Sequence, residues 1–352
     1  MLSPSPRVMS SPSSQNPSLA GPAPPRLSVV IPTFNCLALT QAMFASLQAT
    51  VSPRIRHEII FVDDGSTDDT RAWLRALHAG AAPPHPGRTA LRLLFNERNL
   101  GYAASNNRGA AAASGELLAL LNNDLILRWR WLEPILAIHD ELGSRAGLVG
   151  NLQRNASSGE LDHAGLDLTP AGKPYHLRHL PPLWWRLIIP MQVVPAVTGA
   201  CVVVSRALWQ RLGGFDEGYR NGGEDIDLCY RARAAGKINV VALRSVVRHH
   251  ISASPGRKRH DEANSYRLAL RWRQAMALDA ARAWCWEFLA RGPHSSKYRA
   301  ALAACAFLAH LRDQPPPEAI AGVEDRMGVE FARWREMFGE RPPAAGDLLR
   351  SS

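Results

Sequence analysis

Short apolar runs that alternate with helical segments and end in polar residues constrain the fold of this chain most strongly. The run from Leu27 to Ile31 stops at a proline, and the run from His57 to Val62 stops at an Asp-Asp-Gly turn. Residues 39–48, between these runs, carry apolar side chains at helical spacing. Two such runs joined by a helix predict a β-α-β unit with parallel strands.

The same alternation continues in the next part of the chain. Residues 91–95 and 117–121 are predicted strands, and residues 103–113 between them are a predicted Ala-rich helix. Strands that are apolar throughout need helices on both faces, which favours an α/β fold with a mostly parallel sheet covered by helices. Such sheets bind ligands beyond the carboxyl ends of their strands, where the polar clusters of this sequence stand.

Less regular elements are predicted after residue 131. They are a helix to about His139, a strand at Leu148–Val149, a Gly- and Pro-rich stretch over 155–182, a buried strand over 200–204, a helix to Leu212, a helix from Glu224 to about Ala235, and a strand over 238–242. Ser205 is expected to cap the first of the two later helices, and Gly236 to end the second. From residue 261 onward, Ala, Arg and Trp at helical spacing predict a helical region, with Leu302 and Phe307 among its apolar positions.

The length and composition fit a globular protein of roughly two domains. The chain has 352 residues, of which 46% are hydrophobic and 20% charged. Residues 1–25 are rich in Ser and Pro and lack the apolar run of a signal peptide, so we expect a disordered leader. We assign residues 26–252 to the α/β domain and residues 253–352 to a helical C-terminal region with a Pro-rich tail. The five scattered cysteines disfavour a disulfide framework and indicate a reducing compartment.

One segment, residues 187–204, is apolar enough to suggest a membrane helix. It contains Pro190 and Pro195, which would leave backbone groups without hydrogen bonds that lipid cannot replace. We therefore expect a buried strand and its approach loop at this position.

Three polar clusters carry the candidate chemistry, and each has a structural alternative. Adjacent aspartates in residues 63–68 suit hydrogen bonds from a nucleoside, although turns and helix caps are their commoner role. Residues 122–124 offer oxygen ligands for Mg²⁺ or Mn²⁺, or cap the next segment. Residues 222–227 place carboxylates behind a Gly pair, as a base or as a helix cap. The histidines at 249–250 gain interest as ligands only if they approach one of these carboxylates.

The order of these motifs resembles that of the family 2 glycosyltransferases of the GT-A fold. The motifs are Ser28–Asn35 (SVVIPTFN), Ile60–Asp68 (IFVDDGSTD), Asn99–Gly109 (NLGYAASNNRG), Leu121–Asp124 (LNND), Thr198–Cys201 (TGAC), Gly213–Glu217 (GGFDE) and Gly223–Leu228 (GEDIDL). The resemblance covers about residues 26–252. Each motif is weak alone, but all of them in this order make a chance match improbable.

The resemblance implies an inverting transferase that moves a sugar from a nucleotide diphosphate to an acceptor hydroxyl. It implies that the nucleotide sugar is bound by Thr33, Asp63, Asp64, Asn107 and Asn123. It further implies that Asp225 is the catalytic base, that Asp124 and His249 hold Mn²⁺ or Mg²⁺, and that Gly199, Asp216 and Glu224 form the acceptor side.

This sequence departs from the family's D-x-D metal motif at Asn122, where a neutral amide replaces a carboxylate. We therefore expect weaker metal binding. Asn at this place is familiar in the bacterial rhamnosyltransferase-like branch. The resemblance implies a UDP-, GDP- or dTDP-linked donor, a glycan or lipid-linked acceptor, and a cytoplasmic protein of cell-envelope polysaccharide synthesis.

A formal charge of +10 leaves other functional classes to consider. A nucleotide- or nucleic-acid-binding protein without catalytic activity is the main alternative, but the basic residues are dispersed and form no recognised nucleic-acid module, so no nucleic-acid partner is expected. A dinucleotide oxidoreductase lacks support, because Pro32–Asn35 stands where its Gly-rich fingerprint would follow the first strand.

Two segments with aromatic and basic residues suggest peripheral contact with a membrane. They are Trp184-Trp185-Arg186 and the stretch from Tyr266 to Arg291. Amphipathic aromatics beside basic residues suit the interface of anionic lipid, where a lipid-linked acceptor would be presented. The alternative for the second segment is an ordinary amphipathic helix packed on the α/β domain.

Overall fold

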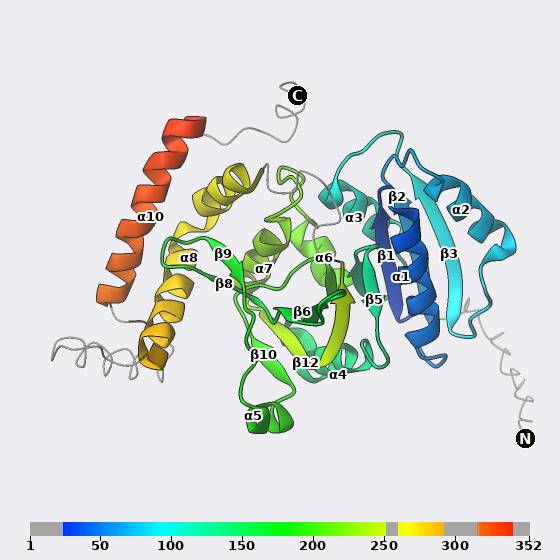
Figure 1. Ribbon diagram of the computed structural model, residues 1–352, viewed down its shortest axis with the longest axis horizontal. Helices are drawn as coiled ribbons and strands as arrows, with labels where there is room; N and C mark the ends of the chain where they lie inside the picture. Colours follow the sequence, from blue (N-terminus) through cyan, green and yellow to red (C-terminus); the bar gives the residue numbers. More distant parts are fainter. Residues whose placement is uncertain (1–23, 251–259, 292–314, 316, 341–352) are drawn as a thin grey trace, which may run out of the picture.

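The computed structural model describes residues 24–250, 260–291, 315 and 317–340 (Figure 1). Nearly all of the expected leader, the segment with Leu302 and Phe307, and the Pro-rich tail lie outside these residues.

A ten-stranded mixed sheet forms the centre of the molecule, with the strand order β10-β12-β6-β11-β4-β1-β2-β3. In addition, β5 pairs with β12 and β7 pairs with β6. The strands are β1 (Leu27–Thr33), β2 (His57–Asp63), β3 (Arg88–Phe95), β4 (Leu117–Leu121), β5 (Leu125–Leu127), β6 (Ala146–Asn155), β7 (Leu161–His163), β10 (Met191–Val193), β11 (Cys201–Ser205) and β12 (Ile238–His249). A separate hairpin consists of β8 (Leu166–Leu168) and β9 (Pro174–His176).

Strand direction divides the sheet into two parallel parts. Strands β4, β1, β2 and β3 are parallel to one another, and so are β6 and β12. Strand β11 lies between these two groups and is antiparallel to both β4 and β6. The expected mostly parallel sheet is therefore present, with β11 reversed near its middle. The short strands β5, β7 and β10 are also antiparallel to their partners.

Helices cover both faces of this sheet (Figure 1). They are α1 (Leu37–Thr50), α2 (Thr70–Ala76), α3 (Tyr102–Ala111), α4 (Glu133–Leu142), α5 (Leu183–Ile188), α6 (Arg206–Leu212), α7 (Glu224–Ala234), α8 (Asp261–Arg291) and α10 (Pro317–Phe338), with short turns of π-helix at Leu77–Ala81 and of 3₁₀-helix at Gly143–Arg145. Helices α1, α2 and α4 share one hydrophobic cluster with the sheet, and α3, α6 and α7 share the other. Alternate residues of β1 supply both clusters, because neighbouring side chains of a strand point to opposite faces.

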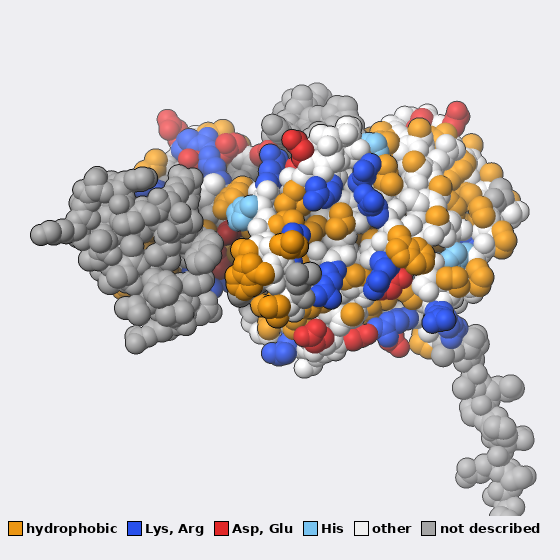
Figure 2. Space-filling view, turned by 60° about the horizontal axis from the view of Figure 1, so that its bottom comes forward, with side chains coloured by type: hydrophobic (Ala, Val, Ile, Leu, Met, Phe, Trp, Pro, Cys, Tyr) orange, Lys and Arg blue, Asp and Glu red, His pale blue; other side chains and the backbone are white. Residues whose placement is uncertain are grey.

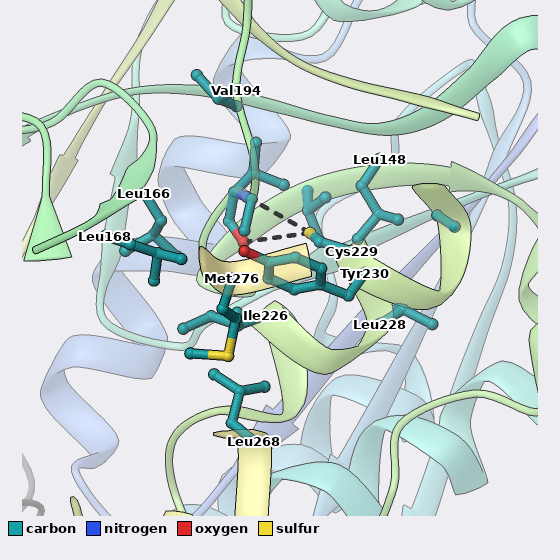
Figure 3. Packing of buried hydrophobic residues seen from close by; sticks show 14 of the residues in the cluster. Leu148, Leu166, Leu168, Val194, Ile226, Leu228, Cys229, Tyr230, Leu268 and Met276 are labelled. Carbon is teal, nitrogen blue, oxygen red and sulfur yellow. Dashed lines mark hydrogen bonds between the residues drawn. The ribbon is translucent and has the colours of Figure 1, made fainter. Parts of the chain in front are cut away.

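The C-terminal helices extend the core around α7. Side chains of α8 and α10, among them Leu268, Met276 and Trp334, belong to the same hydrophobic cluster as Ile226 and Leu228 of α7. Figure 3 shows Leu268 and Met276 beside Ile226, with Leu166 and Leu168 of the β8–β9 hairpin nearby. Helix α7 is therefore buried between the sheet and the C-terminal helices, and its position depends on both.

Most elements expected in the first half of the chain are present close to their predicted bounds, and several short ones were not predicted. Ser205 caps α6 as expected, accepting a hydrogen bond from the Leu208 N–H at 3.1 Å. The stretch expected as loops over 155–182 contains β7, β8 and β9, which have three residues each. Within the segment 187–204, the chain forms β10 and β11. Among the described residues, no helix has both the length and the apolar character needed to cross a bilayer.

Candidate active site

The carboxyl ends of the central parallel strands bring the first two polar clusters together. Thr33 at the end of β1 lies directly opposite Asp63 at the end of β2. The Asp64 N–H donates to the Thr33 carbonyl at 2.7 Å, which continues the pairing past the strands. Strand β4 adjoins β1 on its other side, so the residues after Leu121 emerge at the same edge. The predicted ligand-binding edge therefore exists as one continuous row of strand ends.

Asp63 and Asp64 are both buried, but their contacts differ. Asp64 accepts three hydrogen bonds, from the Asn96 amide at 2.7 Å, the Leu100 N–H at 2.8 Å and the Gly101 N–H at 2.9 Å. It thereby holds the backbone that enters α3. Asp63 pairs through Oδ2 with Arg71 at 2.5 Å, whereas its buried Oδ1 has no partner among the described residues.

The other residues expected to bind the nucleotide sugar make contacts within the protein. Asn107 donates to the Phe215 carbonyl and to Glu217 Oε1 and accepts from the Phe215 N–H, each at 2.9 Å. It therefore ties α3 to the segment after α6. Asn123 donates to Thr40 Oγ1 of α1 at 2.9 Å. The expected contacts of these amides with the nucleotide sugar stay predictions.

Asp124 and His249 meet at the end of β12. Strand β5, which follows Asp124, pairs antiparallel with the last residues of β12, so that Leu125 lies opposite His249. The Nε2 atom of His249 lies 3.2 Å from Asp124 Oδ1. Sequence spacing could not establish this approach, because 125 residues separate the two positions.

The donor set at Asp124 fits a hard divalent cation. Asp124 Oδ1 is buried, and the nearby imidazole is not aligned for a hydrogen bond to it, so the oxygen has no donor within the described part of the chain. The same holds for Oδ1 of Asn122. Among the described residues, no three or more His, Cys, Asp or Glu side chains are arranged so that they could hold a metal ion by themselves. Two protein ligands suit Mg²⁺ or Mn²⁺, which commonly complete their coordination with substrate phosphates and water.

Residues 198–200 connect the cation site to the candidate base. The Asn122 N–H donates to the Ala200 carbonyl at 2.9 Å. One residue earlier, the Gly199 N–H donates to Asp225 Oδ2 at 2.8 Å. The Asp124 motif and Asp225 therefore stand on two sides of the same short segment.

Gly199 is packed so tightly that a larger residue would disturb the site. The Tyr102 hydroxyl donates to the Gly199 carbonyl at 2.8 Å. A Cβ atom at Gly199 would lie 3.0 Å from that hydroxyl oxygen and 3.4 Å from the Cβ of Asp225. Burial, together with the nearby carboxylates of Glu224 and Asp225, raises the pKa of Tyr102 well above its usual range. The phenol therefore stays protonated and keeps its hydrogen bond.

The start of α7 presents Asp225 and uses Glu224 to form the preceding turn. Glu224 is buried, and its Oε2 accepts from the Gly222 N–H at 2.8 Å. Gly222 and Gly223 both have positive φ angles, of 157° and 92°, which explains the Gly pair that precedes the helix. Asp225 Oδ1 accepts from the Ile226 N–H at 2.9 Å. Each carboxylate oxygen of Asp225 thus accepts one backbone hydrogen bond and keeps a second lone pair.

The C-terminal helix α8 reaches the residues that surround Asp225. Asp227, fully buried, pairs with Arg231 at 2.7 Å and accepts from the Trp272 Nε1–H at 2.8 Å. Asp216, which was expected on the acceptor side, lies 3.3 Å from Arg267 of α8. The acceptor roles of Gly199, Asp216 and Glu224 stay predictions.

Three residues that fix the site in place were not predicted from the sequence. Arg71 holds Asp63, Tyr102 holds Gly199, and Trp272 holds Asp227. Tyr102 lies within a motif that was recognised, so its aromatic ring after a glycine was an available signal. Arg71 and Trp272 carry no local signal, because their importance comes only from contacts across the fold.

Comparison with known proteins identifies the domain that carries this site. A family model described as glycosyl transferase family 2 matches residues 28–190. These residues form a domain of this family. The matched segment of the family 2 domain holds the Asp63–Asp64 pair and Asp124, while Asp225 and His249 lie beyond it.

Two curated relatives match the family 2 chain over most of its length but only part of theirs. An uncharacterized protein of Sinorhizobium fredii is 31% identical over 255 residues, which cover 70% of this chain and 26% of the relative. The O-antigen biosynthesis protein RfbC of Myxococcus xanthus is 32% identical over 248 residues, which cover 65% of this chain and 18% of the relative. The chain therefore spans about a quarter or less of these relatives.

A solved structure confirms the expected fold of this family 2 chain. GalNAc-T7, solved with UDP, GalNAc and Mn²⁺, superposes with a TM-score of 0.57 at 15% sequence identity. The match covers 93% of this chain and 58% of that one. At this identity the likeness establishes the GT-A fold alone.

Proposed function

We propose that this protein is an inverting glycosyltransferase that moves a sugar from a nucleotide diphosphate to a hydroxyl group of a glycan or lipid-linked acceptor. The observation that carries this proposal is the bridge through residues 198–200. These residues bond to Asn122 on one side and to Asp225 on the other, and Asp124 and His249, which would hold the cation, lie on the Asn122 side. A transfer reaction needs a stabilised leaving group and a base for the nucleophile at adjacent positions, which this arrangement supplies.

The donor would bind along the carboxyl ends of β1, β2 and β4. Asp63 Oδ1 is buried without a partner, and a nucleoside N–H or hydroxyl donor would satisfy it. Asp124 and His249 would hold Mn²⁺ or Mg²⁺, which when bound balances the negative charge of the diphosphate leaving group. The structure of GalNAc-T7, which has a similar fold, contains UDP and Mn²⁺, and this supports the assignment.

Asp225 would act as the base. The acceptor oxygen forms a bond to the anomeric carbon, the bond from that carbon to the diphosphate oxygen breaks, and the hydroxyl proton passes to the Asp225 carboxylate. The Gly199 and Ile226 N–H groups orient this carboxylate. A single displacement inverts the anomeric carbon and needs no second carboxylate as a nucleophile.

The biological setting follows from the relatives and from the metal motif. The RfbC relative is named for O-antigen biosynthesis, which supports a role in cell-envelope polysaccharide synthesis. Asn122 in place of an Asp supports a rhamnosyl-type donor and a less stringent metal requirement. We place the protein in the cytoplasm, in peripheral contact with the inner face of the membrane that carries a lipid-linked acceptor.

A donor screen tests this function. The full chain is incubated with UDP-, GDP- and dTDP-sugars, with Mn²⁺ or with EDTA, and release of the nucleotide is followed. We expect release from one nucleotide class, its loss in EDTA, and its recovery with Mn²⁺ or Mg²⁺. Full activity in EDTA would mean that cationic side chains balance the leaving group. If no donor turns over and nucleic acid binds with a steep salt dependence, the binding-protein alternative holds.

A further inference from the structure

The two segments that suggested membrane contact differ in the structure. In α8, Tyr266 is fully buried and the Trp272 indole N–H is bonded to Asp227, so this face packs on the rest of the protein. Helix α5 and strand β10 instead form a projection at one end of the molecule (Figure 1). Four apolar side chains of this projection are exposed, with exposed fractions of 64% for Leu183, 61% for Trp184, 74% for Ile188 and 69% for Val193.

We propose that this projection, the α5–β10 surface, is a docking site for an anionic lipid surface. Leu183, Trp184, Ile188 and Val193 are its apolar contact residues. Trp184 and Ile188 stand one helical turn apart and share a face of α5, which would enter the interface together. Figure 2 shows hydrophobic side chains gathered on this face of the molecule, with Lys and Arg side chains among them and Asp and Glu side chains along its lower border.

The charge of the α5–β10 surface favours binding to an anionic partner. No Asp or Glu occurs from residue 168 to residue 215, a stretch that contains the whole projection. Arg186 lies within α5, and the exposed Arg244 follows Leu243, whose N–H donates to the Pro190 carbonyl just before β10. A second copy of the chain docked through the same surface would bring Arg186 and Arg244 of both copies together, and like charges at a shared interface repel. Anionic head groups would instead be attracted to them.

The α5–β10 surface and the proposed cation site both adjoin strand β12. Strand β10 pairs with Val240–Ala242, near the start of β12, whereas His249 is the last residue of β12. Strand β12 bulges between Ala242 and Val246, so the partners of Ala242 and His249 on β6, Asn151 and Asn155, are only four residues apart. This spacing corresponds to roughly 13 Å. Lipid contact would therefore hold the catalytic edge close to the membrane surface. The docking inference rests on the proposed function only for the identity of the acceptor.

Flotation of the full chain with vesicles tests the docking surface. The vesicles are phosphatidylcholine alone or an equimolar mixture with phosphatidylglycerol, each at low and high salt. We expect the chain to float with the anionic vesicles at low salt, and binding to weaken at high salt because screening shortens the range of the arginine charges. The double variant Trp184→Ser/Ile188→Ser should lower the floated fraction about tenfold. Trp129→Ser is the matched control, because this tryptophan is 77% exposed outside the projection.

Two further measurements separate the possible failures. The double variant should keep the wild-type circular dichroism and release nucleotide from the donor at the wild-type rate. Normal nucleotide release without flotation of the wild-type chain would overturn the docking surface and leave the proposed function standing. Equal flotation of the double variant would also overturn it. A wild-type dimer that becomes a monomer in the double variant, without flotation, would mean that the occupant is a second copy.

Discussion

The carboxylates at the end of β2 and those on either side of residues 198–200 stand in similar sequence motifs but have different surroundings. Asp64 accepts three hydrogen bonds that fix the entry to α3. Asp124 has a buried oxygen without a donor among the described residues, and Asp225 accepts only one hydrogen bond on each oxygen. The first carboxylate holds the protein together, whereas the other two keep capacity for a ligand. The position of a carboxylate after a strand therefore does not define its role. The number of its oxygen lone pairs that already accept hydrogen bonds within the protein is the better guide.

Replacing the candidate base gives the largest expected effect. Asp225→Asn keeps the shape and the bond from Gly199 but removes the basicity, so turnover should fall about 100-fold or more. Steady-state kinetics measure the loss, and calorimetry with the nucleotide checks that donor binding persists. Near-normal turnover would remove Asp225 from the mechanism.

Weakening the cation site should give a smaller loss. Asp124→Asn keeps one oxygen ligand but removes its charge, so turnover should fall about tenfold or more and the Mn²⁺ concentration for half-activity should rise. A titration of activity against Mn²⁺ checks both effects. An unchanged metal requirement would contradict the assignment of Asp124 as a metal ligand. Asp124 would then have a structural role like that of Asp64.

The contrast predicts a stability effect at Asp64 instead. Asp64→Asn turns one acceptor oxygen into a donor that faces backbone N–H groups, so the free energy of unfolding should fall by about 2–3 kcal/mol. Urea denaturation measures this change. Asp69→Asn is the matched control, because Asp69 is exposed and makes no side-chain cap bond, and it should change stability by less than about 0.5 kcal/mol. A loss of donor affinity without a loss of stability would place Asp64 in the nucleotide pocket.

A fourth carboxylate sharpens the comparison through its pH dependence. Burial raises the pKa of Asp167 to about 6, although the Leu168 N–H bond opposes the shift. Since the folded pKa lies above the unfolded value of 3.8, stability is lost as the pH rises through about 6. Asp167→Asn should therefore stabilise the fold at pH 8, by about 1–3 kcal/mol, and have little effect at pH 4. Equal stability of both proteins at pH 8 would show that the carboxylate is ionised without cost.

Long elements with regularly spaced apolar residues could be predicted from the sequence. Very short elements, and strands whose direction depends on distant partners, could not. The apolar runs of β1, β2 and β4 and the helical spacing of α1 and α3 needed no information from elsewhere in the chain. Strands β7 to β10 have three residues each, too few to show a period of two. The direction of β11 was not predictable either, because it depends on the neighbours that the fold provides.

The candidate site was predictable in its residue types more than in its contacts. The strand-end position of Asp124 and the Gly pair before Asp225 are local signals. The meeting of Asp124 with His249 arises from the pairing of β5 with β12, which only the folded chain shows. The engagement of Asn107 by Phe215 and Glu217 is likewise a contact between distant segments. Motif order therefore identified the family, and packing separates anchoring side chains from those open to ligands.

The reversed strand β11 has a consequence for how this protein is made. Strands β4 and β6 are synthesised first, yet β11 lies between them, and β11 begins at Cys201. The segment matched by the family model ends at residue 190, so it holds both edges of a gap without the strand that fills it. We therefore expect that, on the ribosome, the two parts of the sheet join only after residues 201–205 have emerged and paired with both edges. Cooperative folding therefore begins late in synthesis, and the boundary of sequence similarity does not mark an independently folding unit.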